Sequence, residues 1–418
     1  MKPSLLRQAA ADYGTPLYVY DVDIVRARFA ELDALFGGRF GVSYAVKSNP
    51  NIGLLSAIRD CVTTFDVSSY GEMERALSSG CPASDVTFSG PGKRVEEIHR
   101  AVRAGLGELV LESVEEAEIA NAAAGEFGCK QGALLRINPI SVPRRFGVNM
   151  AGKPSQFGVD EEDIETAIPR ILALPNIDLI GFHIYSGTNS LSHEAIAENF
   201  AIFLEVFRKA ATLTGRPPQK LVFGSGFGLP YLPTDETLDV AALAAQVIPA
   251  IDAFRAEPLM GEAELVLEMG RWLVGPAGWL LTAVIGGKTS RGTTFRICDA
   301  GFNNHLAACG MMGTVIRRNW RFANISRPEA EEEVYTLVGP LCTTIDVLAS
   351  AIALPRLETG DVIAIDYSGA YGLTASPTRF ISHPEPREVL LEGSEVRDVT
   401  ESLLNHWPST GPMPRQAD

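Results

Sequence analysis

Short apolar runs alternate with segments of helical spacing over the first two thirds of the chain. Each run has four to eight residues rich in Val, Ile, Leu or Phe, which is typical of strands buried on both faces. Segments such as Val95–Ala104, Val114–Ala123 and Glu194–Leu213 carry apolar residues at helical intervals between them. The eight runs are Gly41–Val46, Val62–Val67, Val86–Ser89, Glu108–Leu111, Ala133–Ile137, Leu179–Ile184, Lys220–Phe223 and Glu264–Leu267. This alternation predicts a closed parallel (β/α)8 TIM barrel rather than an open sheet.

The pattern changes after Gly275, where helical periodicity weakens and turn residues separate short strand-like runs. These runs are Leu280–Ile285, Thr294–Ile297, Val334–Val338 and Val362–Asp366. The strand-like segment Thr15–Tyr20 precedes the barrel, and we expect it to join this second unit. We therefore predict a barrel domain over residues 25–275. Residues 1–24 together with 276–418 are expected to form a β-rich domain of the β-sandwich or β-barrel kind.

Composition narrows the choice of partners. The chain has 418 residues, a net charge of −15 and 46% hydrophobic residues, which allows a large core and argues against nucleic acid or anionic membrane as the main partner. No apolar run reaches the about 18 residues that a membrane span needs. The segment Met1–Tyr18 lacks the layout of a signal peptide. The six cysteines form no CxxC pair, so we expect no metal site and predict a cytoplasmic protein with reduced thiols.

The predicted barrel indicates where chemistry belongs, because catalytic groups lie just past the carboxyl ends of the strands. Lys47 follows a buried run directly, and burial lowers the pKa of an ammonium, which makes the amine a nucleophile toward aldehydes. Taken alone, such a lysine is more often one whose stem packs while its amine reaches solvent. Polar or glycine residues follow the other strands as well, namely Asp66, Ser68, Ser89, Glu112, Arg136, His183, Ser186, Gly224, Ser225, Gly226, Glu268 and Arg271.

The seventh and eighth strands end in the residues best suited to a phosphate-bearing cofactor. Gly224–Gly228 offers backbone N–H groups to an anion where barrels commonly bind phosphate, although an ordinary tight turn is the alternative. Glu268 and Arg271 are either a plain ion pair or the partners of a pyridoxal ring nitrogen and its phosphate. His183 is suited to stack on a flat ring, and Arg136 otherwise forms a salt bridge of the barrel.

Six motifs, in this order, resemble the pyridoxal-phosphate decarboxylases of the alanine-racemase-like fold, also called fold type III. This is the group of diaminopimelate and ornithine decarboxylases. The resemblance extends from Tyr13 to Pro384. The motifs are Tyr44–Lys47, His183–Gly187, Gly224–Gly228, Glu268–Arg271, Gly339–Asp346 and Gly369–Gly372. Taken alone, Cys342 and Tyr371 in the last two motifs read as ordinary packed side chains.

The resemblance implies pyridoxal 5'-phosphate as cofactor and a homodimer with shared active sites. Lys47 would bind the cofactor covalently, His183 would stack on its ring and Glu268 would face the ring nitrogen. Cys342 would enter from the partner subunit and protonate the carbanion that loss of CO2 leaves. The remaining roles are phosphate binding by Ser186, Arg271, Tyr371 and the loop of Gly224, Ser225 and Gly226, and support of the site by Asp66 and Arg136.

The departures from the family pattern bear on the substrate. Val222 and Ser225 replace an aspartate and a glycine of the phosphate loop, and Met269 stands where proline is usual. Thr343 occupies the position after the cysteine, where diaminopimelate and ornithine decarboxylases carry a carboxylate for the distal ammonium. A site without that carboxylate would leave a buried ammonium unpaired, which disfavours diaminopimelate, ornithine, arginine and lysine.

Asn304–Ala308, Val315–Asn319, Ser368–Ser376 and Phe380–Pro384 resemble the branch of the family in specialised metabolism. This branch includes the butirosin-type enzyme, which acts on glutamyl attached to an acyl-carrier protein, and exosortase-associated members. A tethered substrate presents an amide or thioester and needs no distal carboxylate. The tentative substrate-binding residues are Thr343, Asp346, Asn304 and His305. Arg317 and Arg318 are either a dock for an acidic carrier protein or a solvated basic pair.

Three other functions stay open. One is diaminopimelate decarboxylation itself, in lysine biosynthesis. The second is amino-acid racemisation, which the Cys342 segment disfavours. The third is a non-catalytic homologue that binds the cofactor, which the presence of Lys47, Glu268 and Cys342 disfavours.

Overall fold

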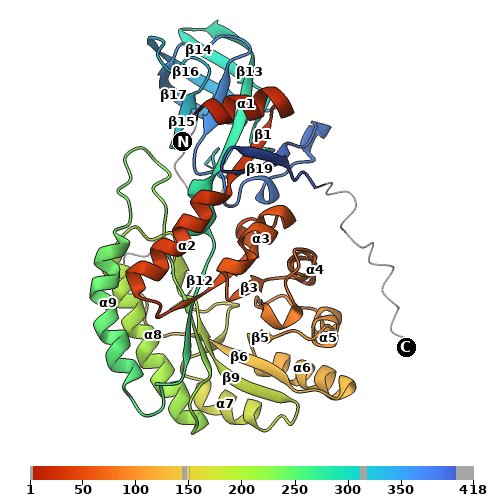
Figure 1. Ribbon diagram of the computed structural model, residues 1–418, viewed down its shortest axis with the longest axis vertical. Coiled ribbons are helices and arrows are strands. Elements are labelled where there is room, and N and C mark those ends of the chain that lie inside the picture. Colours follow the sequence, from red (N-terminus) through yellow and green to blue (C-terminus); the bar gives the residue numbers. More distant parts are fainter. Residues whose placement is uncertain (1–2, 144–147, 150, 311–317, 402–418) are drawn as a thin grey trace.

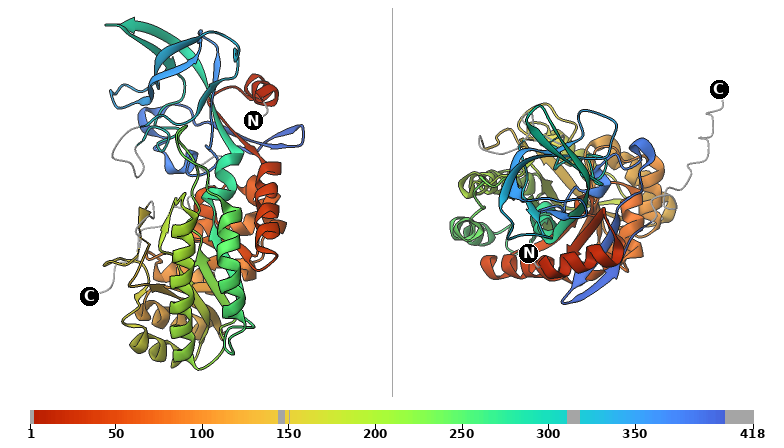
Figure 2. Two further views of the ribbon diagram at one scale, coloured as in Figure 1. Left: turned by 90° about the vertical axis from the view of Figure 1, so that its left-hand side faces the viewer. Right: turned by 90° about the horizontal axis from the view of Figure 1, so that it is seen from above.

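The computed structural model describes residues 3–143, 148–149, 151–310 and 318–401. Two units are stacked along the long axis of the molecule, a helix-covered barrel and a β-rich unit (Figure 1). Figure 2 shows the same stacking from the side and from above. The predicted fold class is confirmed.

The barrel consists of eight parallel strands, each hydrogen-bonded to the next, and the last strand closes onto the first. Each strand overlaps one of the predicted apolar runs. The strands are β2 (Gly41–Ala45), β3 (Thr64–Val67), β4 (Val86–Phe88), β5 (Glu108–Leu111), β6 (Gln131–Asn138), β9 (Ile177–Ile184), β11 (Lys220–Gly224) and β12 (Glu264–Met269). Closure places the carboxyl ends of all eight strands on one rim.

Helices cover the outside of the barrel, and polar caps fix where several of them begin. Ser69, Ser113 and Ser192 each accept a hydrogen bond from the backbone N–H three residues further on, which satisfies a donor that the first helical turn leaves free. The helices are α2 (Val22–Phe36), α3 (Ile52–Ile58), α4 (Tyr70–Ser78), α5 (Val95–Arg103), α6 (Val114–Phe127), α7 (Ile164–Leu172), α8 (His193–Thr214), α9 (Val240–Arg255) and α10 (Arg271–Val274). Short strands on the rim are β7 (Val148–Asn149), β8 (Val159–Asp160) and β10 (Gly187–Thr188).

The interior of the barrel is filled with side chains. Val110, Leu134, Val222 and Val266 form one buried apolar cluster. Val222 therefore packs inside the barrel, which explains why an apolar residue is accommodated where the family usually has an aspartate. At the amino ends of the strands, Lys220 forms an ion pair with Glu108, so a charged pair lies at this end of the barrel.

Among the described residues, the β-rich unit contains the four predicted downstream strands, four further downstream strands and the N-terminal β1. Its sheet runs β17-β16-β14-β13-β1-β19-β20, while β18 pairs with β13 and β15. The N-terminal strand β1 (Leu17–Asp21) lies between β13 and β19, so the prediction that it joins this unit is confirmed. The other strands are β13 (Gly278–Ser290), β14 (Thr293–Cys298), β15 (Phe322–Asn324), β16 (Glu332–Val338), β17 (Val347–Pro355), β18 (Val362–Ile365), β19 (Arg387–Glu392) and β20 (Glu395–Asp398).

The helix α1 (Pro3–Tyr13) was not predicted, and it covers one face of the β-rich sheet. Its Leu6 and Ala9 belong to a separate small core with Leu17, Trp279 and Val389. The predicted domain boundaries, between residues 24 and 25 and between residues 275 and 276, stay a prediction. Helix α2 begins at Val22, so the first boundary lies inside this helix.

Candidate active site

Lys47 lies in a short 3₁₀ turn, Val46–Ser48, directly after the carboxyl end of β2. Its Nζ is 3.5 Å from Oδ2 of Asp66, at the end of β3, and 3.5 Å from Oε1 of Glu268, at the end of β12. The Lys47 side chain is 39% exposed, whereas those of Asp66 and Glu268 are 2% and 4% exposed. The amine therefore stands at the open side of a buried pair of carboxylates.

The pKa values of this triad differ from the sequence-based expectation. Burial lowers the pKa of Lys47, as expected, but Glu268 and Asp66 outweigh burial and raise it well above its ordinary value. Burial and the charge of Glu268 raise the pKa of Asp66, in spite of Lys47. Burial also opposes ionisation of Glu268, yet Lys47 and the hydrogen bond from His183 lower its pKa overall. The sequence could not give this result, because it depends on two carboxylates from distant strands.

His183, near the carboxyl end of β9, contacts the same carboxylate. Its Nε2 donates to Oε2 of Glu268 at 2.6 Å, and its Nδ1 is buried without a hydrogen-bond partner in the described residues. The ring is 2% exposed. One imidazole, one ammonium and two carboxylates thus converge from four strands.

The loop after β11 forms one wall of a hollow beside Lys47. The hollow is lined by Lys47, Tyr185, Thr188, Ser225, Gly226, Glu268, Arg271 and Tyr371 among others. Gly226 has a φ of +70°, a conformation that glycine adopts without strain. A Cβ on Gly224 would lie 2.3 Å from Cδ2 of Tyr185, so only glycine allows the strand end to pack there.

Unused donors in the same region show what the hollow can hold. Oγ of Ser186 and Nε of Arg271 are buried and have no hydrogen-bond partner in the part of the chain that the structure describes. Buried polar groups normally have partners, so these donors point to a bound anion. Together with an amine for an aldehyde and a buried carboxylate for a ring nitrogen, they fit pyridoxal phosphate.

Tyr371 reaches this hollow from the β-rich unit. The guanidinium of Arg271 lies 4.7 Å from the centre of the Tyr371 ring, and the backbone N–H of Tyr371 donates to the carbonyl of Ser48 at 2.8 Å. Nδ2 of Asn49 donates in turn to the carbonyl of Gly369 at 3.0 Å. The β-rich unit therefore holds the turn that carries Lys47.

Arg136 lies at the carboxyl end of β6 and pairs with a second rim residue. Its Nη1 is 3.0 Å from Oε1 of Glu112, and its guanidinium lies 4.5 Å from the centre of the Phe157 ring. Glu112 also accepts from the backbone N–H groups of Gly90 and Gly158. The pair is buried, and the charge of Arg136 contributes to the lowered pKa of Glu268.

Cys342 and the tentative substrate residues lie in the β-rich unit. The Cys342 side chain is exposed in the single chain, and Thr343 beside it is half-buried. Asp346 is 2% exposed and accepts from the backbone N–H groups of Phe302 and Leu341 at 2.8 and 2.9 Å. Its carboxylate therefore holds the loop together, and its contact with a substrate stays a prediction.

Asn304 and His305 are buried, 1% and 0% exposed. The His305 ring meets Trp320 edge-on, 4.8 Å between ring centres, and burial lowers the His305 pKa to about 3. His305 is therefore a neutral imidazole packed inside the β-rich unit. Arg317 lies outside the described residues, and Arg318 is exposed.

Two tyrosines of this region were not predicted from the sequence, Tyr185 in the lining of the hollow and Tyr231 beside Arg271. Burial raises the pKa of Tyr185 to about 12, and its ring lines the hollow between Lys47 and the glycine loop. The hydroxyl of Tyr231 accepts from Nη1 of Arg271 at 2.9 Å. Tyr185 lies in the motif His183–Gly187, which the sequence did indicate. Tyr231 lies in none of the six motifs, so no sequence pattern pointed to it.

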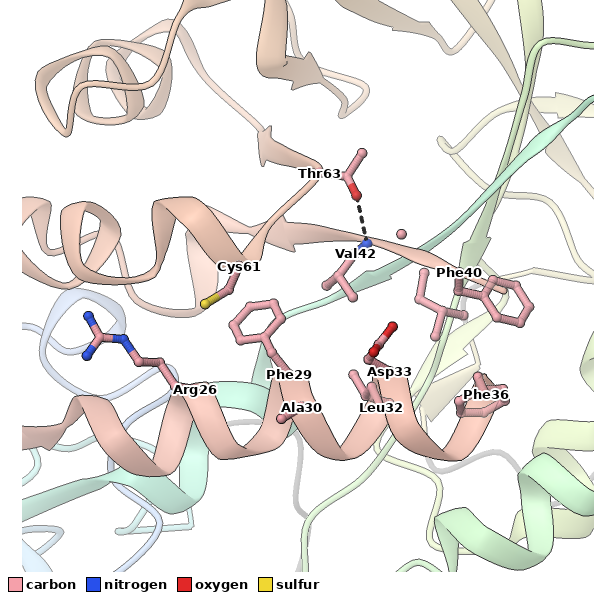
Figure 3. Close-up of a pocket in the computed structure, with 12 residues that line it drawn as sticks. Arg26, Phe29, Ala30, Leu32, Asp33, Phe36, Phe40, Val42, Cys61 and Thr63 are labelled. Carbon is pink, nitrogen blue, oxygen red and sulfur yellow. Dashed lines mark hydrogen bonds between the residues drawn. The ribbon is translucent and has the colours of Figure 1, made fainter. Parts of the chain in front are cut away.

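A second hollow lies at the opposite ends of the strands, near the starts of β2 and β3 (Figure 3). Phe29 and Phe36 of α2 line it together with Phe40, and Arg26, Asp33 and Cys61 also contribute (Figure 3). It contains none of the groups that gather around Lys47 and does not belong to the same site.

Comparison with known proteins agrees with this geometry. The family model for the pyridoxal binding domain of pyridoxal-dependent decarboxylases matches residues 22–275. The chain is 32% identical over 382 residues to L-glutamyl-[BtrI acyl-carrier protein] decarboxylase of Niallia circulans, covering 90% of this chain and 89% of that protein. It is also 32% identical over 400 residues to diaminopimelate decarboxylase of Pseudomonas aeruginosa, covering 94% and 92%.

Among solved structures, diaminopimelate decarboxylase from M. jannaschii in complex with L-lysine superimposes with a TM-score of 0.83 at 28% identity, over 94% of this chain and 91% of that one. The chain belongs to the family of pyridoxal-dependent decarboxylases. It is a carboxy-lyase, and its cofactor is pyridoxal phosphate. None of the helices in the described residues combines the length and hydrophobicity that crossing a bilayer requires.

Proposed function

We propose that this decarboxylase acts on an aminoacyl group tethered to an acyl-carrier protein, in specialised metabolism, rather than on a free diamino acid. The loop Leu341–Asp346 carries this proposal. Its only acidic side chain is Asp346, and that carboxylate is buried and accepts from two backbone N–H groups. A distal ammonium brought here would find no free carboxylate on this loop, whereas an amide or thioester needs none.

We assign the holding of the cofactor to residues that line or lie near the hollow beside Lys47, most of them in the barrel. Lys47 supplies the amine for covalent attachment to the aldehyde. Arg271, Tyr371, Ser186 and the backbone of Ser225–Gly226 supply the donors for the phosphate. The buried anionic Glu268 would hold a proton on the ring nitrogen, His183 would stack on the ring, and Asp66 and Arg136 would support the charges of the site.

When bound, pyridoxal phosphate withdraws the electron pair that loss of CO2 leaves on the substrate. Glu268 would maintain that withdrawal, because its lowered pKa keeps it charged and a charged carboxylate would hold a proton on the ring nitrogen. Glu268 and His183 are buried away from water, which strengthens the electrostatic interaction between them. The proton that completes the reaction is assigned to the thiol of Cys342.

We further propose that the active enzyme is a homodimer in the cytoplasm and that Cys342 of the partner subunit completes each site. Large apolar side chains are exposed near the Cys342 loop, with Ile345 at 48% and Phe380 at 45%. The Phe380 ring packs 5.7 Å from that of Phe302, whose backbone Asp346 holds. A partner subunit would cover this surface. All six cysteines are free thiols, which fits a reducing compartment.

The substrate test compares CO2 release from two sets of candidates with the purified, cofactor-loaded enzyme. One set is the free amino acids diaminopimelate, ornithine, lysine, arginine and glutamate. The other is the corresponding aminoacyl groups on a carrier protein or on pantetheine. We expect faster release from the tethered set, and preference for a free diamino acid would overturn the proposal.

The dimer test mixes two inactive variants, Lys47→Ala and Cys342→Ala, after unfolding and refolding together. If each site takes Lys47 from one subunit and Cys342 from the other, random pairing restores about a quarter of wild-type activity. If light scattering shows dimers but no activity is recovered, Lys47 and Cys342 of the same subunit form each site, and the proposal of a shared site is wrong.

Diaminopimelate decarboxylation is the second candidate, because this chain has the same sequence identity, 32%, to a diaminopimelate decarboxylase as to the carrier-protein-dependent enzyme. Release of CO2 from free diaminopimelate would select it. Thr343→Glu is a matched variant for this comparison, since it adds the carboxylate that the loop lacks. If the natural substrate is tethered to a carrier protein, this variant should gain activity on the free diamino acid and lose activity on the tethered substrate.

A further inference from the structure

Arg271 is held by a tyrosine that belongs to neither the glycine loop nor the other predicted phosphate ligands. Nη1 of Arg271 donates to the hydroxyl of Tyr231 at 2.9 Å, and the guanidinium lies 5.7 Å from the centre of the Tyr231 ring. Burial raises the pKa of Tyr231 even beside this cation, so its hydroxyl is neutral. Nε of Arg271 stays without a partner in the described residues. One end of the guanidinium is thus fixed and another N–H is available.

Tyr231 is in turn held by the β-rich unit. Its ring stacks on Trp320, with 4.4 Å between ring centres and 22° between ring planes. Arg321 contacts both neighbours of Tyr231. Its Nε donates to the carbonyl of Pro230 and its Nη2 donates to the carbonyl of Leu232, each at 3.0 Å. Two adjacent residues of one unit therefore clamp three consecutive residues of the other.

We propose that Tyr231 is a positioning residue, which aims Arg271 at the phosphate of the cofactor and is itself set by Trp320 and Arg321. This inference rests on the proposed role of Arg271 in phosphate binding. An arginine side chain loses considerable rotamer freedom when it binds, and a guanidinium fixed in advance loses less at that moment. Phosphate affinity consequently depends on contact between the barrel and the β-rich unit.

The test measures affinity of the full-length apoenzyme for pyridoxal phosphate and for pyridoxal, which lacks the phosphate. Binding is followed by the visible absorbance of the attached cofactor. We expect Tyr231→Phe, which keeps the ring and its stacking, to weaken pyridoxal phosphate binding about tenfold, because a hydrogen bond to a charged group is lost. Pyridoxal affinity should change less than about twofold, because Arg271 does not act on it.

The variant Arg321→Met tests whether the contact with the β-rich unit positions Tyr231. It should lower pyridoxal phosphate affinity in the same direction, and it should add little when combined with Tyr231→Phe, because both act through one contact. Full additivity of the two changes would refute the link to the β-rich unit. Tyr335→Phe is the matched control, since it removes a hydroxyl that serves Glu333 and Leu357 elsewhere in that unit. It should leave the ratio of the two affinities unchanged.

Arg271→Met separates failure of this inference from failure of the proposed site. If it abolishes the preference for pyridoxal phosphate over pyridoxal while Tyr231→Phe leaves that preference intact, Tyr231 does not position Arg271. Equal weakening of both compounds by Tyr231→Phe would mark a merely structural role and would also overturn the inference. If Arg271→Met itself leaves the preference intact, the assignment of Arg271 to phosphate is wrong.

Discussion

Nε2 of His183 lies 2.6 Å from Oε2 of Glu268, while Nζ of Lys47 lies 3.5 Å from the other oxygen of the same carboxylate. Both oxygens of a nearly inaccessible carboxylate therefore face nitrogen donors. Burial alone would raise the pKa of Glu268, but these two neighbours lower it. The site thus contains a buried carboxylate whose lowered pKa favours its charged form.

Lys47→Ala should abolish CO2 release and the visible absorbance of the bound cofactor, because no other amine in the described residues lines this hollow. Loss of absorbance after dialysis, compared with the wild-type enzyme, checks the prediction. Lys288→Ala, at an exposed position of the β-rich unit, is the control and should behave as wild type. Full turnover by the Lys47 variant would refute the covalent role.

Glu268→Gln should lower kcat by about 10²–10³-fold, the range for loss of one buried electrostatic partner of a transition state, while the cofactor stays attached. A neutral amide cannot hold the proton on the ring nitrogen. Steady-state kinetics with cofactor content measured by absorbance separates the two effects. The control is Glu264→Gln at the opposite end of the same strand, where the side chain is 45% exposed and pairs with Lys220. Equal loss in both variants would contradict the assigned role.

Asp346→Ala should destabilise the Cys342 loop, because the N–H groups of Phe302 and Leu341 lose their acceptor. The expected cost is about 1–3 kcal/mol for each donor left buried and unpaired. Urea denaturation gives the loss of stability, and kcat should fall more than cofactor affinity, since Lys47 and the phosphate donors are untouched. Thr344→Ala, an exposed neighbour, is the control. An Asp346 variant with wild-type stability would mean that the loop does not depend on this carboxylate.

Glu388 predicts a pH dependence of stability. It lies on β19, accepts from the hydroxyl of Tyr20 at 2.8 Å and from Nδ2 of Asn51 at 3.1 Å, and burial raises its pKa to about 7. The unfolded chain releases this proton near pH 4.5, so the folded state binds more protons between about pH 4.5 and about pH 7. Folding stability should therefore fall across this interval, by on the order of 3 kcal/mol from this residue.

Urea denaturation of Glu388→Gln at several pH values tests this dependence. The variant should have a different stability at every pH, because its amide pairs differently with Tyr20 and Asn51, but it should lack the decline from pH 4.5 to 7 that the wild-type residue causes. Glu392→Gln on the same strand, whose side chain is 52% exposed, should keep the wild-type slope. Identical slopes for wild type and the Glu388 variant would show that this carboxyl titrates normally.

The barrel and most of its chemistry follow from local features of the sequence. Eight apolar runs separated by helical segments are enough for strands buried on both faces, and the rule that functional groups follow strand ends then selects Lys47, His183, Glu268 and Arg271. The N-terminal strand could be assigned to the β-rich unit because it precedes the barrel pattern. Helix α1 was missed because it lies outside the barrel pattern, and β15 because it spans only Phe322–Asn324.

Only the tertiary structure determined which charged side chains lie close enough to shift one another's pKa values. The sequence predicted a lowered pKa for Lys47 from burial, but the carboxylates that reverse this shift come from β3 and β12, and barrel closure brings them within 3.5 Å. Likewise, the sequence offered Asp346 as a substrate ligand, and only the fold showed that it also accepts from the backbone N–H groups of Phe302 and Leu341. The sequence by itself determined the strands and the reactive residues at their ends, because periodicity and strand-end chemistry are local. The tertiary structure decided their pKa values, the sequestering of Asp346 and the clamp on Tyr231, because Coulomb energies and hydrogen bonds depend on distances between segments far apart in the chain.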